Sequence, residues 1–161
     1  MLTLQPRPGV APVLVLAIGN PSRGDDALGP LAAQRIEAMG LPGVEVLTDF
    51  QLQVEHALDL LGRDTVLFID ASVAGEAPFE LRELAPAAQP RHTTHSLHPA
   101  AVLGVCQQLT GSTPAARLLA IRGDSFALGS PLSAAAAARL DAALVALMPV
   151  LTAPLAQRDP A

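Results

Sequence analysis

Apolar runs of five or six residues alternate along this chain with segments of helical periodicity. The runs at 13–18 and 65–69 are rich in Val, Ile and Leu, as are strands that are buried on both faces. Between and after these runs, apolar side chains recur at steps of three and four residues, which is the spacing of a helix with one buried face. Strands that alternate with helices build a parallel sheet, because each helical crossover returns the chain to the same end of the sheet. The sequence therefore predicts an α/β fold, a single domain with a mostly parallel, twisted sheet of about five strands and helices on both faces.

The boundaries of the expected elements follow from the same patterns. The expected strands are 13–18, 44–47, 65–69, 79–84 and 117–121, of which 79–84 is the weakest and suits a sheet edge. The expected helices are 27–39, 51–61, 96–109 and 132–148, with Pro149 ending the last of them. A chain of 161 residues is long enough for one domain with a substantial core. We expect this domain to span 13–150, between an N-terminal extension at 1–12 and a frayed C-terminal tail at 151–161.

Composition excludes several classes of function. The formal charge is −5 and the ten basic residues are scattered, so a nucleic-acid partner is not expected. Cys106 is the only cysteine, which excludes an internal disulfide and a CxxC motif, and its apolar neighbours predict a buried, inert thiol. Residues 1–12 lack the pattern of a signal peptide, and Arg139 and Asp141 interrupt the apolar segment near the C-terminus. We therefore expect a cytoplasmic protein without a membrane partner.

The turn after the first strand carries the most informative polar residues. It reads Gly-Asn-Pro-Ser-Arg-Gly-Asp-Asp from Gly19 to Asp26. Gly19 and Gly24 have the glycine spacing of a P-loop, but Asp25 and Asp26 replace the lysine and hydroxyl with which such a loop binds phosphate and magnesium. Carboxylates repel phosphate groups, so this turn does not suit a nucleotide. Paired acids suit a metal ion or a proton-transfer role instead.

A structural role for these acids is the alternative. Pro30 is tolerated only in the first turn of a helix, so the helix is expected to begin near Ala27. Asp26 would then be the N-cap, a role that contributes about 1 kcal/mol. One carboxylate can do both, and the residues alone leave the two roles open. We assign the chemical role to Asp26, although the adjacent Asp25 could also take it.

Three side chains are expected to converge on one edge of the sheet. Asp26 follows the first strand, Asp70 ends the third, and His95 precedes the helix that comes after the fourth. In open α/β sheets, functional groups gather at the carboxyl ends of the strands. Two carboxylates and an imidazole suit a divalent ion such as nickel or zinc, with positions left open for substrate. The alternatives are a turn-forming role for Asp70 and a surface position for His95.

A second group of polar residues follows the second strand. Asp49, Gln51 and Glu55 could line the same edge of the sheet, or they could simply cap and solvate the expected helix at 51–61. The solvating role is the simpler interpretation of the two.

Three motifs in order resemble those of the hydrogenase maturation endopeptidases. The turn from Gly19 to Gly29 matches their pattern G-N-x-x-x-x-D-[DE]-x-x-G, a later strand ends in Phe68-Ile69-Asp70, and Thr93-Thr94-His95 precedes a helix. The similarity extends from about Val13 to about Met148. The resemblance implies a phosphorylase/hydrolase-like α/β fold, and it implies that nickel in the substrate is met by Asp26, Asp70 and His95. Some members of the family have Glu at the position of Asp26.

The resemblance also implies an activity. A protein of this family removes a C-terminal extension from the nickel-loaded large subunit of a [NiFe] hydrogenase, so the expected partner is a large-subunit precursor and the expected metal is nickel, with zinc or cadmium able to substitute in vitro. The motifs look most like those of the branch that serves soluble, NAD-reducing enzymes. Either the ion polarises the scissile carbonyl or an aspartate acts as general base on water. The rival hypotheses are a non-catalytic nickel-binding checkpoint module and a small-molecule hydrolase or phosphorylase on a similar scaffold.

Overall fold

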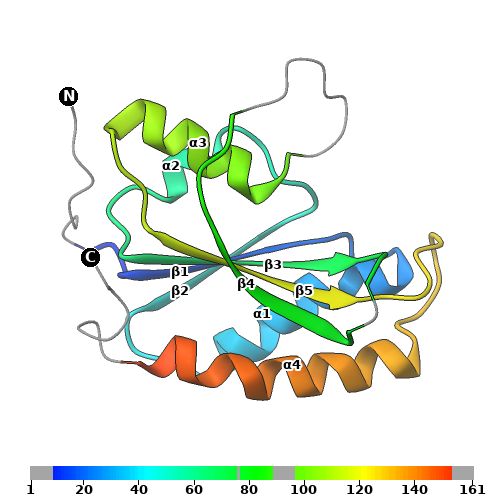
Figure 1. The fold of residues 1–161 in the computed structure, drawn as a ribbon. Helices are drawn as coiled ribbons and strands as arrows, with labels where there is room; N and C mark the ends of the chain where they lie inside the picture. Colours follow the sequence, from blue (N-terminus) through cyan, green and yellow to red (C-terminus); the bar gives the residue numbers. More distant parts are fainter. Residues whose placement is uncertain (1–8, 76, 89–96, 154–161) are drawn as a thin grey trace.

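A five-stranded sheet organises the part of the chain that is described, residues 9–75, 77–88 and 97–153 of a computed structural model. The strands are β1 (Val13–Ile18), β2 (Val44–Asp49), β3 (Thr65–Ser72), β4 (Phe79–Leu84) and β5 (Ala115–Arg122). Their order is β2-β1-β3-β5-β4, and β4 runs antiparallel to β5 while the other pairs are parallel (Figure 1). The mostly parallel α/β sheet predicted from the sequence is confirmed, and the weak strand at 79–84 lies at the edge.

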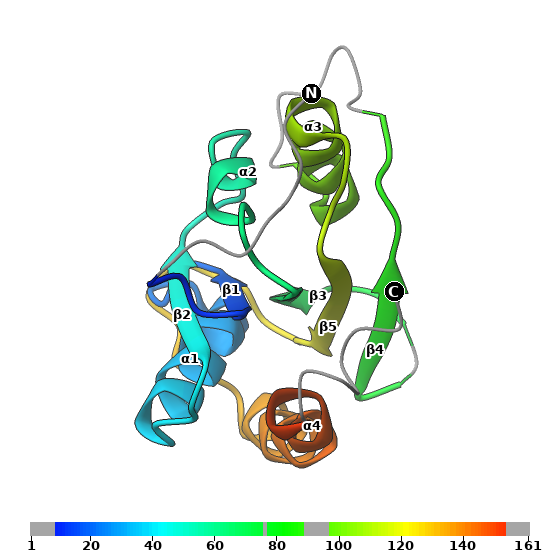
Figure 2. The same ribbon diagram turned by 90° about the vertical axis from the view of Figure 1, so that its left-hand side faces the viewer.

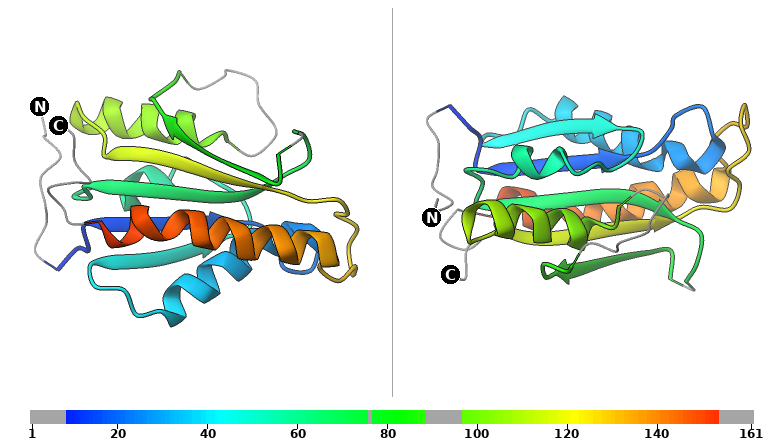
Figure 3. Two further views of the ribbon diagram at one scale, coloured as in Figure 1. Left: turned by 60° about the horizontal axis from the view of Figure 1, so that its bottom comes forward. Right: turned by 90° about the horizontal axis from the view of Figure 1, so that it is seen from above.

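Helices cover both faces of this sheet. The helices are α1 (Leu28–Ala38), α2 (His56–Asp59), α3 (Pro99–Thr110) and α4 (Ala134–Thr152), and a short 3-10 turn, η1 (Gly24–Ala27), leads into the first of them. α1 and α4 pack on one face, whereas α2 and α3 cover the other (Figure 2). Figure 3 shows α1 and α4 side by side beneath the sheet. This two-sided cover explains why all six residues of β1 are buried.

Alternation along the strands divides the core into two layers. Side chains at odd positions of β1 face α1 and α4, and side chains at even positions face α2 and α3. The α1/α4 layer contains Val13, Val15, Ala17, Leu67 and Ile69, and the α2/α3 layer contains Leu14, Leu16, Ile18, Val66 and Phe68. A polar residue at the carboxyl end of a strand therefore belongs to a defined face of the sheet.

The helix expected at 51–61 is much shorter than predicted. Only α2, four residues from His56 to Asp59, is helical. The His56 ring accepts a hydrogen bond from the Gln53 N–H, with Nδ1 2.8 Å from the nitrogen. This bond is typical of a helix N-terminus, where a side chain three residues later accepts an N–H that has no helical partner, so the helical turns begin only after Gln53.

The last helix continues beyond its expected end. α4 begins after Ser133, whose Oγ accepts a hydrogen bond from the Ala136 N–H at 3.2 Å, and it runs through Pro149 to Thr152. The prediction that Pro149 ends this helix is wrong. A proline removes one helical N–H, and the carbonyl that loses its partner belongs to Val145, which is 75% exposed and open to water.

Among the described residues, α4 is the one helix that is long and apolar enough to be a candidate membrane span. Two charged residues on it have partners within the fold, as Arg139 Nη1 lies 3.1 Å from Asp124 Oδ2, and Asp141 pairs with Arg35 of α1. Its apolar side packs on the sheet through Ala136, Leu140, Ala143, Leu144, Leu147 and Leu151. In this fold, α4 therefore belongs to the core.

Candidate active site

The turn between β1 and α1 is built for close packing at the carboxyl end of the sheet. A Cβ at Gly19 would lie 2.0 Å from the Asp26 carbonyl oxygen, and a Cβ at Gly29 would lie 2.2 Å from the Ile18 carbonyl oxygen. Only hydrogen fits at these positions, so the start of α1 rests directly on the end of β1. The Asp26 carboxylate accepts a hydrogen bond from the Asn20 N–H at 2.7 Å. Asp26 is thereby fixed above the carboxyl end of the first strand.

Asp26 does not cap the helix, so the N-cap interpretation is wrong. Ala27 occupies the N-cap position of α1, and no side chain accepts a capping hydrogen bond there. The first N–H of α1, that of Leu28, finds its acceptor in the preceding 3-10 turn, because it donates to the Asp25 carbonyl oxygen. Since η1 continues directly into α1, the Asp26 carboxylate is not needed to cap this N–H group.

Asp25 has a structural role that sequence patterns did not reveal. It is fully buried, and its carboxylate accepts hydrogen bonds from the backbone N–H groups of Asp124 (2.7 Å), Ser125 (3.2 Å) and Ser133 (2.8 Å) and from the Ser133 hydroxyl (2.8 Å). Burial on its own would raise the pKa of Asp25, but these hydrogen bonds outweigh it and hold the pKa below its ordinary value. Asp25 therefore ties the turn to the loop between β5 and α4, and Asp26 is the acid of the pair that is partly exposed.

Asp70 lies at the carboxyl end of β3, after the buried Ile69, and it is close enough to Asp26 to feel its charge. The pKa of Asp70 is raised to about 7, chiefly by burial and also by the negative charge of Asp26, although the hydrogen bond from the Ala71 N–H (2.8 Å) lowers it. The structure thus brings together two of the three predicted site residues. Their mutual repulsion would be relieved by a proton or by a bound cation.

His95 and its neighbour His92 lie outside the described residues. The chain is described again from Leu97, which packs in the α2/α3 layer just before α3 begins at Pro99. His98 is the N-cap of α3, because its Nδ1 accepts a hydrogen bond from the Ala100 N–H at 3.0 Å, so this helix begins at Pro99 and not at 96 as expected. Burial and the charge of Arg82 lower the pKa of His98. Within the described residues, no cluster of three or more His, Cys, Asp or Glu side chains is arranged to hold a metal ion.

The second group of candidate residues, those that follow β2, occupies two different environments. Asp49 ends β2 at the same edge as Asp70, and its Oδ2 lies 3.2 Å from Nε2 of His56. Gln51 and Glu55 are exposed, and Glu55 stands at the N-cap position of α2 without a capping hydrogen bond. Solvation is therefore confirmed for these two residues, but capping by Glu55 is wrong. Sequence reasoning missed His56, although a buried polar residue four positions after Leu52 on an otherwise apolar stripe is a usable signal.

Cys106 is fully buried in the α2/α3 layer, and burial raises the pKa of its thiol. Its Sγ lies 3.7 Å from the Ser112 carbonyl oxygen, which accepts a weak hydrogen bond. A thiol that is buried and protonated is a poor nucleophile, so the prediction of a buried, inert cysteine is confirmed.

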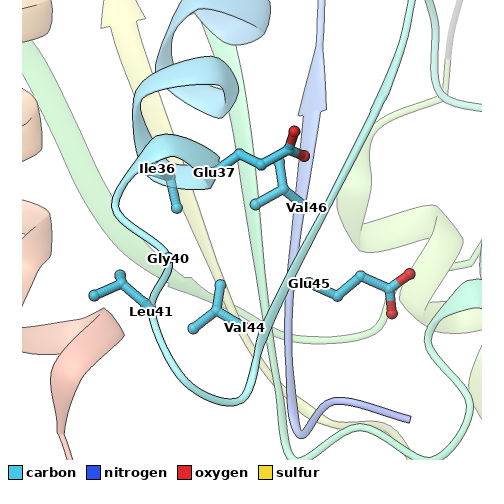
Figure 4. Close-up of a pocket in the computed structure, with 7 residues that line it drawn as sticks. All are labelled: Ile36, Glu37, Gly40, Leu41, Val44, Glu45 and Val46. Carbon is cyan, nitrogen blue, oxygen red and sulfur yellow. The ribbon is translucent and has the colours of Figure 1, made fainter. Parts of the chain in front are cut away.

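Two pockets lie near opposite ends of β2. One, of about 250 Å³, lies at the carboxyl edge and is lined by Gly19, Pro21, Pro30, Thr48, Asp49 and Phe50. The other, of about 260 Å³, lies between the end of α1 and the start of β2, and Figure 4 shows that its two carboxylates, Glu37 and Glu45, point in different directions. Glu45 is already paired with Arg63, at 2.7 Å. The polar groups suited to chemistry therefore gather at the carboxyl edge.

Known proteins resemble this chain in structure, although neither family models nor curated sequences match it. No protein-family model matches the sequence, and no curated protein sequence matches it significantly. Three similar solved structures are those of the [NiFe] hydrogenase maturation protease HycI from Thermococcus kodakarensis KOD1 (25% identity, 89% of this chain and 94% of that chain, TM-score 0.66), the hydrogenase maturating endopeptidase HybD from E. coli (25%, 84% and 91%, 0.64), and the [NiFe] hydrogenase maturation protease HybD from Thermococcus kodakarensis (21%, 86% and 98%, 0.65).

These likenesses cover most of each chain and place the protein in the class of single-domain α/β endopeptidases. Both structures at 25% identity are hydrogenase maturation proteases, and the likeness in fold covers 89% and 84% of this chain. The chain belongs to the hydrogenase maturation endopeptidase family. The narrower assignment to the branch that serves soluble, NAD-reducing enzymes stays a prediction.

Proposed function

We propose that this protein is the endopeptidase that removes the C-terminal extension from the large-subunit precursor of a [NiFe] hydrogenase. The observation that carries the proposal is the pair Asp26 and Asp70, which two separate strands bring together at the carboxyl edge of the sheet. Their placement fits the fold-wide likeness to two maturation proteases of 25% identity. The cytoplasmic location and the precursor partner expected from the sequence are part of this proposal.

Nickel enters this proposal as part of the substrate. Two carboxylates that repel each other are suited to a divalent cation, because the cation stabilises the charged form of both. Asp26 and Asp70 would supply oxygen ligands, and His95, which the resemblance names, would supply the nitrogen that nickel also accepts. Zinc or cadmium would occupy the same ligands in vitro. The requirement for nickel would then explain how a peptidase with so small a site avoids cleaving other proteins.

Either group can activate water in such a site. An ion carried by the precursor would polarise the scissile carbonyl. A carboxylate would act as general base, and Asp70 suits that role because a pKa of about 7 leaves it able to accept a proton at neutral pH. In that case Asp70 takes a proton from water as the oxygen attacks the carbonyl carbon, and the proton passes to the departing amine.

Mass spectrometry of the precursor after incubation with the purified protein tests the proposal. Nickel-loaded precursor should lose its C-terminal extension, and nickel-free precursor should stay intact. Asp26→Asn and Asp70→Asn should each abolish or strongly reduce cleavage, whereas Glu37→Gln, which removes an exposed carboxylate at the opposite end of the sheet, should have no effect. Binding without cleavage would instead identify a checkpoint module, and indifference to the precursor would favour a small-molecule hydrolase.

A further inference from the structure

A third carboxylate, that of Asp49, lies on the same face of the sheet as Asp70. Asp49 pairs with Ile18 across β1 and β2, and the register Ala17 to Ile69 between β1 and β3 puts the next residue, Asp70, on the other side of Ile18. Neighbours in one row of a parallel sheet point to the same face, here the face covered by α2 and α3. Two strand spacings separate the carboxylates by roughly 10 Å.

His56 fixes the Asp49 carboxylate in place. Because Nδ1 of His56 accepts the Gln53 N–H at 2.8 Å, that nitrogen carries a lone pair, and the ring proton of the neutral side chain is on Nε2. Nε2 lies 3.2 Å from Asp49 Oδ2, within ion-pair distance, and the Phe50 N–H donates to Asp49 Oδ1 at 2.7 Å. The His56 ring is only 9% exposed, so it is held by packing as well as by these bonds.

The Asp49 carboxylate is held by the Phe50 N–H and by the neighbouring His56 ring, but it still faces solvent. Its side chain is 45% exposed, and no arginine in the described part of the chain pairs with it. The sequence contains no lysine, so no such side chain of this protein can serve. Phe50, which is 60% exposed, adds an aromatic ring beside the acid, and an aromatic face attracts cations. A fixed, solvent-facing carboxylate next to an aromatic ring is suited to a cationic group.

We propose that Asp49 is a specificity-determining residue that binds a cationic side chain of the precursor peptide, and that His56 is the positioning residue that orients it. This inference rests on the proposed function. A peptide advances at most about 3.5 Å per residue when extended, so a span of roughly 10 Å from Asp70 corresponds to about three residues. The cationic side chain therefore lies within about three residues of the scissile bond.

Steady-state kinetics on the nickel-loaded precursor tests Asp49. Asp49→Asn keeps an acceptor but loses the charge, and it should raise KM about tenfold, the value of one charge-assisted hydrogen bond, with kcat within about twofold of wild type. Replacing the basic residues within three positions of the scissile bond by Glu should weaken cleavage by the wild type. Asp49→Arg should then cleave this acidic precursor better than the wild type does.

Two substitutions at His56 separate positioning from packing. The terminal amide of Gln can replace Nε2 as the donor to Asp49, whereas Asn can replace only Nδ1 as the acceptor from Gln53. His56→Gln should therefore keep KM near the wild-type value, and His56→Asn should raise it towards that of Asp49→Asn, with both variants folded by circular dichroism.

Several results would overturn the inference while the proposed function stands. If the wild type cleaves the precursor but Asp49→Asn lowers kcat with KM unchanged, Asp49 acts on the reacting atoms rather than on a distant side chain. Equal KM values for His56→Gln and His56→Asn would refute the positioning role, and failure of Asp49→Arg on the acidic precursor would refute cation recognition. If the wild type cleaves no precursor at all, the proposed function fails first.

Discussion

Replacement of Asp25 by asparagine is expected to destabilise the fold, although it only replaces one carboxylate oxygen by an NH₂ group. The buried Asp25 carboxylate accepts four hydrogen bonds, three of them from backbone N–H groups. An asparagine side chain presents one oxygen and one NH₂ group, so the NH₂ group would face donors that belong to Ser133 or to Asp124 and Ser125. Each buried N–H that loses its acceptor costs about 1–3 kcal/mol. The orientation that places the NH₂ group at the Oδ1 position leaves one such N–H, that of Ser133, so we expect a loss of about 2 kcal/mol from a total stability of about 5–15 kcal/mol.

Equilibrium unfolding in urea at pH 7 measures this loss, and Asp26→Asn is the matched control. The Asp26 carboxylate accepts one hydrogen bond within the described residues, from the Asn20 N–H, and the asparagine oxygen can keep it, so the stability of this variant should change by less than about 1 kcal/mol. The folded-state pKa of Asp25 is below the ordinary value of 3.8, so its contribution is present above that value and is lost as the pH falls through the folded pKa. Equal stabilities for the two variants at pH 7 would refute the tethering role of Asp25.

Further predictions concern the paired acids and the metal. The pKa of Asp70 is about 7 in the folded protein against an ordinary 3.8, so the metal-free protein loses stability as the pH rises through this window. The free energy of unfolding of Asp70→Asn, measured in urea, should match that of the wild type near pH 4 and exceed it at pH 8 by up to about 4 kcal/mol. A difference of equal size at both pH values would contradict this prediction. Asp26→Asn should remain folded but leave loaded precursor uncut, and full processing by this variant would remove Asp26 from the site. Calorimetry should detect weak uptake of nickel, zinc or cadmium at one site, and binding that is unaffected by His95→Ala would count against that ligand set.

The strands could be predicted from sequence because their signal is local. The run from Val13 to Ile18 is apolar at every position, and only a strand covered on both faces uses such a run in so short a segment. The apolar pattern of β4 is weaker because this strand lies at the edge of the sheet, where one of its sides lacks a partner strand. The position of Asp70 followed directly, because a polar residue that ends a buried strand is fixed by the strand itself.

The errors arose where distant contacts decide the local structure. Asp26 looked like an N-cap, but a 3-10 turn leads into α1, and the Asp25 carbonyl in that turn accepts the Leu28 N–H. The turn itself is held by the loop near Ser125, about a hundred residues later in the chain, whose carbonyl accepts the Asp25 N–H. The same loop gives Asp25 its role. The helix predicted at 51–61 was too long for a different, local reason, since the ring of His56 bonds to the Gln53 backbone three residues earlier, which apolar periodicity does not encode.

The bonds between Asp25 and Ser133 span 108 residues, which has a consequence for the order in which the protein is made. During synthesis, β1 and the turn that follows it leave the ribosome long before the donors of Asp25 exist. A nascent chain that ends before Ser133 carries both aspartates of the turn but lacks the groups that hold Asp25, and burying that charge without its donors is costly. The turn therefore reaches its final form only after Ser133, 108 residues later than Asp25, has been translated. A truncated nascent chain is accordingly expected to be inactive towards a precursor, even though every side chain of the paired-acid site is already present in it.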